Sequence, residues 1–338
     1  MTNTITADAV ALQERDEFRP DGWLKVIAPA KVNLHLAIGA KRADGYHEAA
    51  TVMHALNLHD VVYLRRSMPD EQPADCRAGS GRVVPTVHMV AGDPSIVLPE
   101  LSSADNLAAR AVVVLADALQ LPEDATNLQI RIEKSIPAQA GLGGGSTNAA
   151  AALVGAAQLW GLPADDSAIE QVAKTLGADV AFFLRGGCAY LEGTGDTFVH
   201  ALQPSKQAVA LVKPEGGVST AQAYRQFDER PTYADDDLAA DVRQALAADD
   251  VQLYNNLAAA SEIIMPQLAD AREWLAGQEG VCGSLLCGSG AATFALCDDF
   301  SAACRVVAAA RKRGWWARTS SLGSARVMVS SSTGGVSA

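Results

Sequence analysis

The sequence predicts an α+β protein with two domains. Its 338 residues are enough for two domains or one large one. Strand-like alternation and helix-like apolar periodicity are mixed along the whole chain, and a new strand–helix pattern opens at Ala208. We therefore expect a flexible leader at 1–20, a first domain at 21–205, a second and smaller domain at 206–330, and a flexible tail at 331–338.

The first 104 residues are read mainly as strands and loops. A short A-P-A-K bend separates the first two expected strands, Asp44-Gly45 predicts a turn, and the apolar run 49–58 is ambiguous. The segment 67–104 is rich in proline and glycine, which predicts surface loops. The expected strands are 23–27, 32–38 and 59–65, with short strands around 83–89.

Residues 105–203 alternate between clear helices and strands. Asp105 or Asn106 can cap a helix over 106–119, and Gly177 can close a helix over 167–176. Between them lie an alternating strand, a glycine-rich stretch and an alanine-rich helix. The remaining expectations are a strand at 128–134, a helix at 149–160, and a hairpin of 188–191 with 197–200.

The second domain is expected to repeat strands and helices in another order. The acidic cluster at 235–237 is read as a helix cap or a solvated face. The expected strands are 208–213, 283–287, 292–296 and 325–329, and the expected helices are 220–227 and 301–313.

Composition excludes several classes of protein. The formal net charge of −12 argues against a general binder of nucleic acid or of membrane surfaces. No apolar run is long enough to span a bilayer, and the N-terminus lacks the features of a secretory signal. The six cysteines form no CxxC pair and the six histidines show no metal-ligand spacing. We expect reduced thiols, a cytoplasmic location and no obligate protein partner.

The stretch 136–152, I-P-A-Q-A-G-L-G-G-G-S-T-N-A-A-A-A, has the character of an anion site. It follows a predicted strand and precedes a predicted helix, whose first N–H groups and dipole attract negative charge. Gly143, Gly144 and Gly145 remove the Cβ atoms that would obstruct a phosphate. Ser146 and Thr147 add hydroxyl groups that could donate to it or contact magnesium.

Two known nucleotide motifs do not fit this stretch. No lysine precedes Ser146, as the loop G-x-x-x-x-G-K-[ST] would require, and no acidic residue follows at the spacing of a dinucleotide fingerprint. The alternative is a flexible loop before a tightly packed helix. Three consecutive glycines cost roughly 0.5–1 kcal/mol each in regular structure relative to alanine, which favours phosphate binding.

Four separated motifs resemble those of the GHMP kinases. They are P-A-Q-A-G-L-G-G-G-S-T-N at 137–148, A-P-A-K-V-N-L-H-L at 28–36 with R-A-D-G-Y-H-E at 42–48, G-A-D-V-A-F-F at 177–183, and C-G-S-G-A-A-T-F-A-L at 287–296. The resemblance covers about 23–329 in the same order. It implies an N-terminal ATP-binding domain, a smaller C-terminal α+β domain, and an active site in the cleft between them.

The resemblance also implies roles for particular residues. Asp179 would accept the proton of the acceptor alcohol, and Lys31 would hold Asp179 ionised and neutralise charge on the moving phosphoryl group. Without the resemblance, Lys31 would be read as solvated and Asp179 as a cap or an ion-pair partner. The residues expected to bind ATP are Pro137, Ala138, Gln139, Ala140, Gly141, Leu142, Gly143, Gly144, Gly145, Ser146 and Thr147.

The motif D-G-Y-H is similar to that of the branch of this family that acts on a cytidine diphosphate-linked methylerythritol. In that branch Tyr46 and His47 would read the cytosine, and the turn would present them together; otherwise Tyr46 is a packing residue and His47 is solvent-exposed. Asn33 is also expected to hydrogen-bond the substrate; the alternative is a polar residue at a strand edge. Thr220 and Tyr224 share a helical face, and Tyr224 could stack on the other side of the base.

The sequence departs from the family pattern at two places. Thr147 replaces the more usual second serine, which keeps a hydroxyl group. Asn255-Asn256 stands where Asn-Asp is common, and this weakens any role for an acidic residue there.

The expected activity is ATP-dependent phosphorylation of the 2-hydroxyl of the cytidine diphosphate-linked methylerythritol, with Mg²⁺ neutralising phosphate charge. The sequence does not identify the metal ligands, although Ser146 could be one. Two alternatives stay open. One is a kinase of the homoserine or mevalonate type, and the other is a non-catalytic nucleotide-binding protein on the same fold.

Overall fold

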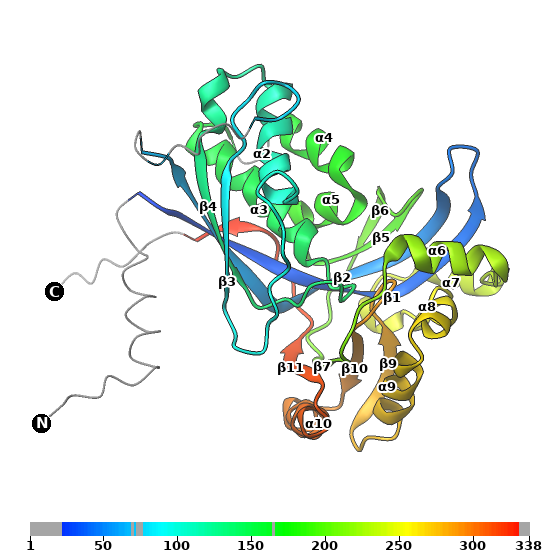
Figure 1. Ribbon diagram of the computed structural model, residues 1–338. Helices are drawn as coiled ribbons and strands as arrows, with labels where there is room; N and C mark the ends of the chain where they lie inside the picture. The colour runs from blue at the N-terminus through cyan, green and yellow to red at the C-terminus, as the bar shows by residue number, and fades with distance from the viewer. Residues whose placement is uncertain (1–21, 69–70, 72–76, 164–165, 331–338) are drawn as a thin grey trace, which may run out of the picture.

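The computed structural model describes residues 22–68, 71, 77–163 and 166–330. The expected leader 1–20 and tail 331–338 therefore lie outside the described residues. Within the described chain, two sheets divide the molecule into an upper and a lower lobe in Figure 1. No helix among the described residues has both the length and the apolar character that crossing a bilayer would require.

The larger sheet has eight strands, of which five follow the order β12-β1-β2-β4-β3. β5 pairs with β2 and β6, and β8 pairs with β1. Its strands are β1 (Leu24–Lys41), β2 (His47–Arg66), β3 (Thr86–Ala91), β4 (Leu128–Lys134), β5 (Cys188–Glu192), β6 (Thr197–Leu202), β8 (Tyr254–Asn255) and β12 (Met328–Val329).

The smaller sheet has four strands in the order β11-β7-β10-β9. They are β7 (Ala208–Lys213), β9 (Val281–Leu286), β10 (Thr293–Cys297) and β11 (Trp316–Ser321). The helices that follow β6 in the chain are α6 (Thr220–Glu229), α7 (Asp236–Gln244), α8 (Ala258–Ile264), α9 (Gln267–Ala276) and α10 (Phe300–Lys312), with a 3₁₀ helix at Ala248–Asp250.

Four helices cover one face of the larger sheet (Figure 1). They are α2 (Leu107–Ala118), α3 (Gly144–Leu159), α4 (Ser167–Leu176) and α5 (Ala178–Arg185), and a 3₁₀ helix at Glu123–Thr126 precedes β4. Asn106 caps α2, because its side chain accepts a hydrogen bond from the N–H of Ala108 at 3.0 Å.

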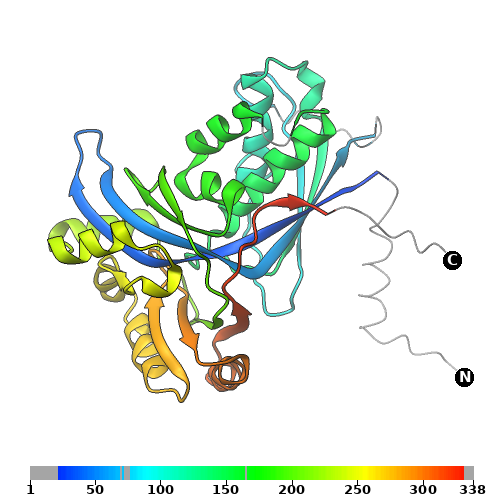
Figure 2. The ribbon, with the colours of Figure 1, turned by 180° about the vertical axis from the view of Figure 1, so that it is seen from behind.

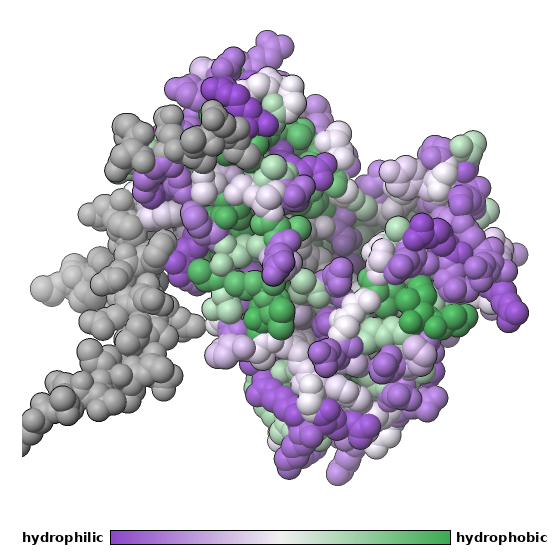
Figure 3. All heavy atoms as spheres, viewed as in Figure 1, coloured by the Kyte–Doolittle hydropathy of each residue, from purple (hydrophilic) through white to green (hydrophobic). Residues whose placement is uncertain are grey.

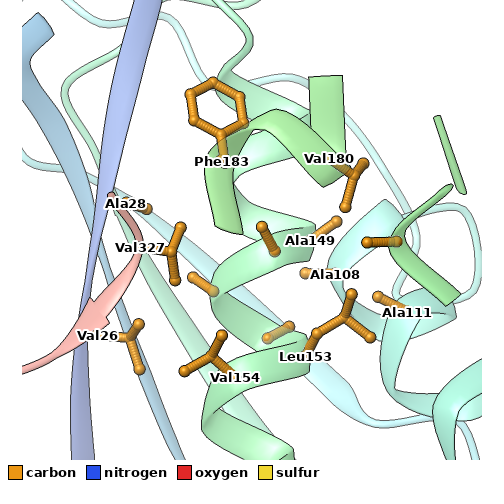
Figure 4. Packing of buried hydrophobic residues seen from close by; sticks show 14 of the residues in the cluster. Val26, Ala28, Ala108, Ala111, Ala149, Leu153, Val154, Val180, Phe183 and Val327 are labelled. Carbon is orange, nitrogen blue, oxygen red and sulfur yellow. The ribbon is translucent and has the colours of Figure 1, made fainter. Parts of the chain in front are cut away.

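The alanines of α3 explain why this helix lies in the middle of the layer. Ala149 to Ala152 are fully buried, and their small side chains let α2, α5 and β1 approach closely. Figure 4 shows Ala149 and Leu153 lying toward Ala108 and Ala111 across this core. Hydrophilic residues cover the outer edges of the face shown in Figure 3, and apolar patches lie nearer its middle.

Several sequence expectations need correction. The A-P-A-K bend does not break the first strand, because β1 continues through it with a register shift between Pro29 and Lys31. β2 likewise runs unbroken through the ambiguous run 49–58. Helix α3 begins at Gly144, five residues before the expected start at Ala149. The run after Asp179 is itself a helix, α5, which was not expected.

The C-terminal strands also differ from expectation. β11 was missed, and it pairs with β7 at an edge of the smaller sheet. The last strand was expected in the second unit, but β12 pairs with β1 at Val26 and Ile27. Figure 2 shows this strand returning to the larger sheet. The chain therefore visits the smaller sheet and ends in the larger one.

Candidate active site

The glycine stretch forms a tight turn between β4 and α3. Gly141 and Gly143 have φ angles of +73° and +75°, in the left-handed region that glycine tolerates best. A Cβ atom at Gly141 would lie 1.8 Å from the carbonyl oxygen of Cys287, and one at Gly143 would lie 2.6 Å from the Phe183 ring. Both positions therefore require glycine on grounds of conformation and of space.

The N-terminus of α3 is open to an anion. Gly143 is the residue before the helix, and no side chain caps it. The N–H groups of Gly144, Gly145 and Ser146 occupy the first turn, where an α-helix offers no internal acceptor. A Cβ atom at Gly145 would meet nothing within 4 Å, so this glycine borders free space. These amides can donate to phosphate oxygens.

Main-chain hydrogen bonds hold this turn against both sheets. The N–H of Lys31 donates to the carbonyl of Leu142 at 3.1 Å, and the N–H groups of Ala291 and Ala292 donate to Gln139 and Ala140 at 2.9 and 3.1 Å. The turn is thus fixed from β1 on one side and, on the other, from the stretch C-G-S-G-A-A at 287–292, called here the second glycine motif.

The hydroxyl groups that follow the glycines differ in their surroundings. Ser146 is partly exposed in the first turn of α3. Thr147 is fully buried, and its Oγ1 atom has no hydrogen-bond partner within the described chain. Ala140 and Leu142 are buried as well, and their carbonyl groups accept the hydrogen bonds from Ala292 and Lys31, so neither side chain is available to a ligand.

Lys31 and Asp179 lie together beside this turn. Lys31 Nζ is 3.4 Å from Asp179 Oδ2, and the side chains are 5% and 30% exposed. A Cβ atom at Gly143 would be 3.2 Å from Lys31 Cγ, which places the lysine stem against the glycine turn. The arrangement brings a cation, a carboxylate and an anion-binding helix end to one place.

A short chain of hydrogen bonds orients the lysine. Lys31 Nζ donates to Asn33 Oδ1 at 2.8 Å, Asn33 Nδ2 donates to Thr51 Oγ1 at 2.9 Å, and Thr51 donates to the carbonyl of His35 at 2.7 Å. Because the amide NH₂ of Asn33 is engaged by Thr51, its oxygen faces the ammonium group. Thr51 was not predicted as part of the site.

Asp179 occupies the first turn of α5. Gly177 ends α4 and precedes α5 with φ of +150°, so the chain turns sharply and projects Asp179 at the start of the new helix. Tyr224 lies close enough that burial, together with the negative charge of Asp179, raises the pKa of its phenol to about 12. Tyr224 is therefore a neutral hydrogen-bond donor beside Asp179.

The β1–β2 hairpin brings His47 to the same region and leaves Tyr46 exposed at its turn. The His47 ring lies 5.2 Å from the Tyr224 ring and its Nε2 atom is 2.7 Å from Asp228 Oδ1. Tyr46 is 66% exposed, because consecutive residues entering a strand point to opposite sides. His47 is packed against Tyr224, and Tyr46, exposed at the turn, stays a predicted contact of the base.

Thr220 lies at the second glycine motif rather than beside His47. Its Oγ1 atom is 3.0 Å from Ser289 Oγ. Asn255 donates to the carbonyls of Leu286 and Gly288 at 2.9 and 2.8 Å, so this amide shapes the same motif. Asn256 bonds the main chain of Ile38 in both directions, which explains a neutral amide at this departure from the family pattern.

A buried ion pair holds the main chain just before the glycine turn. Asp60 is fully buried, pairs with Lys134, and accepts from the N–H groups of Ser135 and Ile136 at 2.7 and 2.9 Å. Asn148 donates to Asp60 at 2.9 Å and accepts from Lys134 at 3.0 Å, which ties α3 to β2 and β4. Asn148 is the polar residue directly before the alanine run, and that signal could have revealed it.

The largest hollow near the turn lies between the two sheets. A cavity of about 1110 Å³ is lined by Pro137, Ala138 and Gln139 on one side and by Lys213–Gly216 and Trp315–Arg318 on the other, with residues 93–95 and 97–99 along its edge. Lys31 and Asp179 are not among the residues that line it. The first residues of the glycine stretch therefore do face a space between the lobes.

Comparison with known proteins relates both halves of the chain to the GHMP kinases. Residues 106–187 match the family described as "GHMP kinases N terminal domain", and residues 237–314 match "GHMP kinases C terminal". A 4-diphosphocytidyl-2-C-methyl-D-erythritol kinase of Desulfitobacterium hafniense is 35% identical over 297 residues, which cover 86% of this chain and 93% of that protein. The kinase of the same name from a Nostoc species is 33% identical and covers 81% and 86%.

Solved structures agree with these relatives. The crystal structure of a 4-(cytidine 5'-diphospho)-2C-methyl-D-erythritol kinase has a TM-score of 0.67 and 31% identity, covering 88% of this chain and 99% of that one. A homoserine kinase from Cytophaga hutchinsonii, 20% identical with a TM-score of 0.64, shares the fold. With two-sheet architecture, glycine turn and sequence relatives in agreement, the chain belongs to the 4-diphosphocytidyl-2-C-methyl-D-erythritol kinase family of the GHMP kinases.

Proposed function

We propose that this protein transfers the γ-phosphoryl group of ATP to the 2-hydroxyl of 4-diphosphocytidyl-2-C-methyl-D-erythritol. The observation that carries the proposal is the Lys31–Asp179 pair, 3.4 Å apart, beside an uncapped helix N-terminus. A protein that only bound nucleotides would use the helix end but would have no need for this pair.

The chemistry follows from the positions of these groups. The oxygen of the substrate 2-hydroxyl would bond to the γ-phosphorus of ATP while Asp179 Oδ2 accepts the hydroxyl proton. The bond between the γ-phosphorus and the β,γ-bridging oxygen would break, and ADP would leave. Lys31 would neutralise charge on the transferred group, and the amides of Gly144, Gly145 and Ser146 would hold the phosphates. Because this transition state is loose, positioning matters more than the basicity of Asp179.

The proposed reaction includes Mg²⁺, and its candidate protein ligand is the hydroxyl of Ser146, a partly exposed residue in the first turn of α3. Within the described residues there is no group of three His, Cys, Asp or Glu side chains able to hold a metal. This fits an ion bound mainly by phosphates and water, with few protein ligands. When bound, Mg²⁺ would neutralise phosphate charge.

A coupled assay of ADP release tests the proposed function. The purified protein is given Mg-ATP with 4-diphosphocytidyl-2-C-methyl-D-erythritol, homoserine or mevalonate in separate reactions. We expect turnover with the first alone, and phosphorus NMR of the product should show a new phosphomonoester. Turnover with homoserine or mevalonate alone would contradict the proposed substrate, and nucleotide binding without any turnover would indicate a non-catalytic binder.

A further inference from the structure

The contacts around His47 come from three directions and fix its ring. Tyr224 lies against one face with the ring centroids 5.2 Å apart, and Phe227 meets it edge-on at 6.2 Å and 82°. Asp228 Oδ1 is 2.7 Å from Nε2. All three partners belong to α6, which packs beside the β1–β2 hairpin (Figure 1). The helix of one lobe thus holds a ring that belongs to the other.

Aromatic packing alone does not decide which ring nitrogen carries the proton, whereas a carboxylate does. An ionised Asp228 can only accept, so the nitrogen next to it must be Nε2–H. In the neutral imidazole the other nitrogen, Nδ1, is then an acceptor. Nothing in the described chain hydrogen-bonds to Nδ1, so it remains available to a ligand.

The carboxylate is itself held in its ionised form. Asp228 Oδ2 accepts from Lys41 Nζ at 2.7 Å, and Lys41 pairs with His47 across the hairpin. Lys41 first, and then His47, lower the pKa of Asp228. The lysine therefore keeps Asp228 as a pure acceptor in the physiological pH range.

We propose that Asp228 is a positioning residue for recognition of the cytosine base: it holds the Nε2 proton of His47, so that Nδ1 accepts a hydrogen bond from the exocyclic amino group of cytosine. This inference rests on the proposed function, whose cytidyl group is expected at His47 from the D-G-Y-H motif. Uracil carries an oxygen where cytosine carries its amino group, so the same Nδ1 lone pair would repel it. Asp228 thus contributes to specificity without touching the base.

The variant Asp228→Asn inverts this arrangement with little change of shape. Lys41 can only donate, so the amide oxygen of Asn would turn toward Lys41 and its NH₂ toward His47. Nε2 would then have to accept, and the imidazole proton would move to Nδ1. We expect at least a tenfold rise in KM for the cytidyl substrate with less than a twofold change in kcat.

Binding of CDP and UDP separates this inference from the proposed activity. With a non-hydrolysable ATP analogue in excess to occupy the glycine turn, calorimetry should show that the unmodified protein prefers CDP by at least tenfold and that Asp228→Asn loses most of this preference. If there is no turnover but this pattern holds, the proposed reaction is wrong and the inference stands. A preference unchanged in Asp228→Asn, or absent from the unmodified protein, would overturn the inference.

Two further variants separate positioning from a structural role. Glu229→Gln makes the same acid-to-amide change on the next residue of α6, whose carboxylate bonds only Gln226 among the described residues, and should leave KM and the CDP preference unchanged. In a His47→Ala background, Asp228→Asn should add less than a twofold change, because it acts through His47. Equal effects of Asp228→Asn with and without His47 would contradict the inference.

Discussion

At the scale of single residues, Lys31 and Asp179 allow the most direct test of the site. Lys31→Ala removes the buried ammonium, and Asp179→Asn removes the carboxylate that would accept the proton. Because such groups typically contribute 10²–10⁴-fold, we expect each variant to lower kcat by roughly 100-fold or more. Steady-state assays check this, and melting temperatures should stay within a few degrees of the unmodified protein.

The control for these variants is Lys174→Ala. Lys174 forms an exposed ion pair with Glu170 at 3.2 Å on the surface of α4, so its removal takes away a lysine without altering the site. Its kcat should equal that of the unmodified protein. Near-normal turnover in Lys31→Ala and Asp179→Asn would refute the roles assigned to both residues.

Asp60 offers a prediction about stability. Asp60→Asn would leave the Lys134 ammonium buried without its counter-charge, and breaking a buried pair from one side costs about 3–5 kcal/mol. We expect a loss of this size in the free energy of unfolding measured with urea. The double variant Asp60→Asn/Lys134→Met removes the stranded charge and should recover part of the loss. The free energies of unfolding lost by Asp60→Asn alone and by Lys134→Met alone are also measured. If the double variant lost the sum of these two amounts, the ion pair would not be the cause of the instability.

Sequence reasoning found some residues of the site and missed others for a physical reason. Lys31, Asn33 and Asp179 stand in short motifs whose chemistry can be read locally. Asp228 bonds His47 across 181 positions of sequence, and Thr51 bonds Asn33 across 18, so neither partnership leaves a local pattern. The role of Tyr46 stays a prediction, because it is exposed at the turn and no contact of its ring within the described residues defines its position.

At the scale of elements, two similar substitutions in the glycine turn are predicted to have different effects on stability. Gly145→Ala places a methyl group in open space at an ordinary φ within the first turn of α3, so stability should not fall and can rise by about 0.5–1 kcal/mol. The same methyl group would intrude where the phosphates are proposed to bind. We expect a KM for ATP raised at least fivefold, measured together with urea unfolding.

Gly143→Ala is the matched comparison. Here φ is +75° and the new Cβ atom would meet the Phe183 ring at 2.6 Å, so the folded state itself should be weakened. A lower urea midpoint is expected for Gly143→Ala and not for Gly145→Ala. An unchanged KM for ATP in Gly145→Ala would show that the phosphates do not approach this helix end.

The elements that the sequence failed to predict have their own causes. α3 starts at Gly144 rather than Ala149 because tertiary packing supports a first turn that glycine would disfavour on its own. The run V-A-F-F-L was too short and too uniformly apolar to show helical periodicity, yet it lies within α5. Conversely, β4 and α4 match their expected ranges, because alternation and capping residues mark both clearly.

At the scale of the whole molecule, β1 joins the two lobes. β12 pairs with it at Val26 and Ile27, and β8 pairs with it at His35 and Leu36, so segments from the second half of the chain complete the larger sheet. His35 is fully buried at this junction and stacks on Tyr254 with ring centroids 5.3 Å apart. His35 therefore lies where a segment from the second half of the chain joins the larger sheet.

This junction predicts a pH dependence of stability. Burial lowers the pKa of His35 and of His54 below their ordinary value of about 6.5, so as the pH falls the unfolded chain takes up these protons before the folded protein does. Their contribution to stability is complete above pH 6.5 and declines below it, by at most about 1.4 kcal/mol per pH unit for each histidine. Carboxylates with ordinary pKa values stay ionised at pH 5.5. Relief of repulsion among the negative charges of the folded protein therefore offsets only a small part of this decline in stability.

Urea unfolding at pH 7.5 and pH 5.5 should show lower stability at pH 5.5, in a single transition. His35→Leu should lose less stability than the unmodified protein over this interval, whereas His59→Gln, at an exposed position, should lose as much. Equal losses in all three proteins would exclude His35 as a source of the dependence.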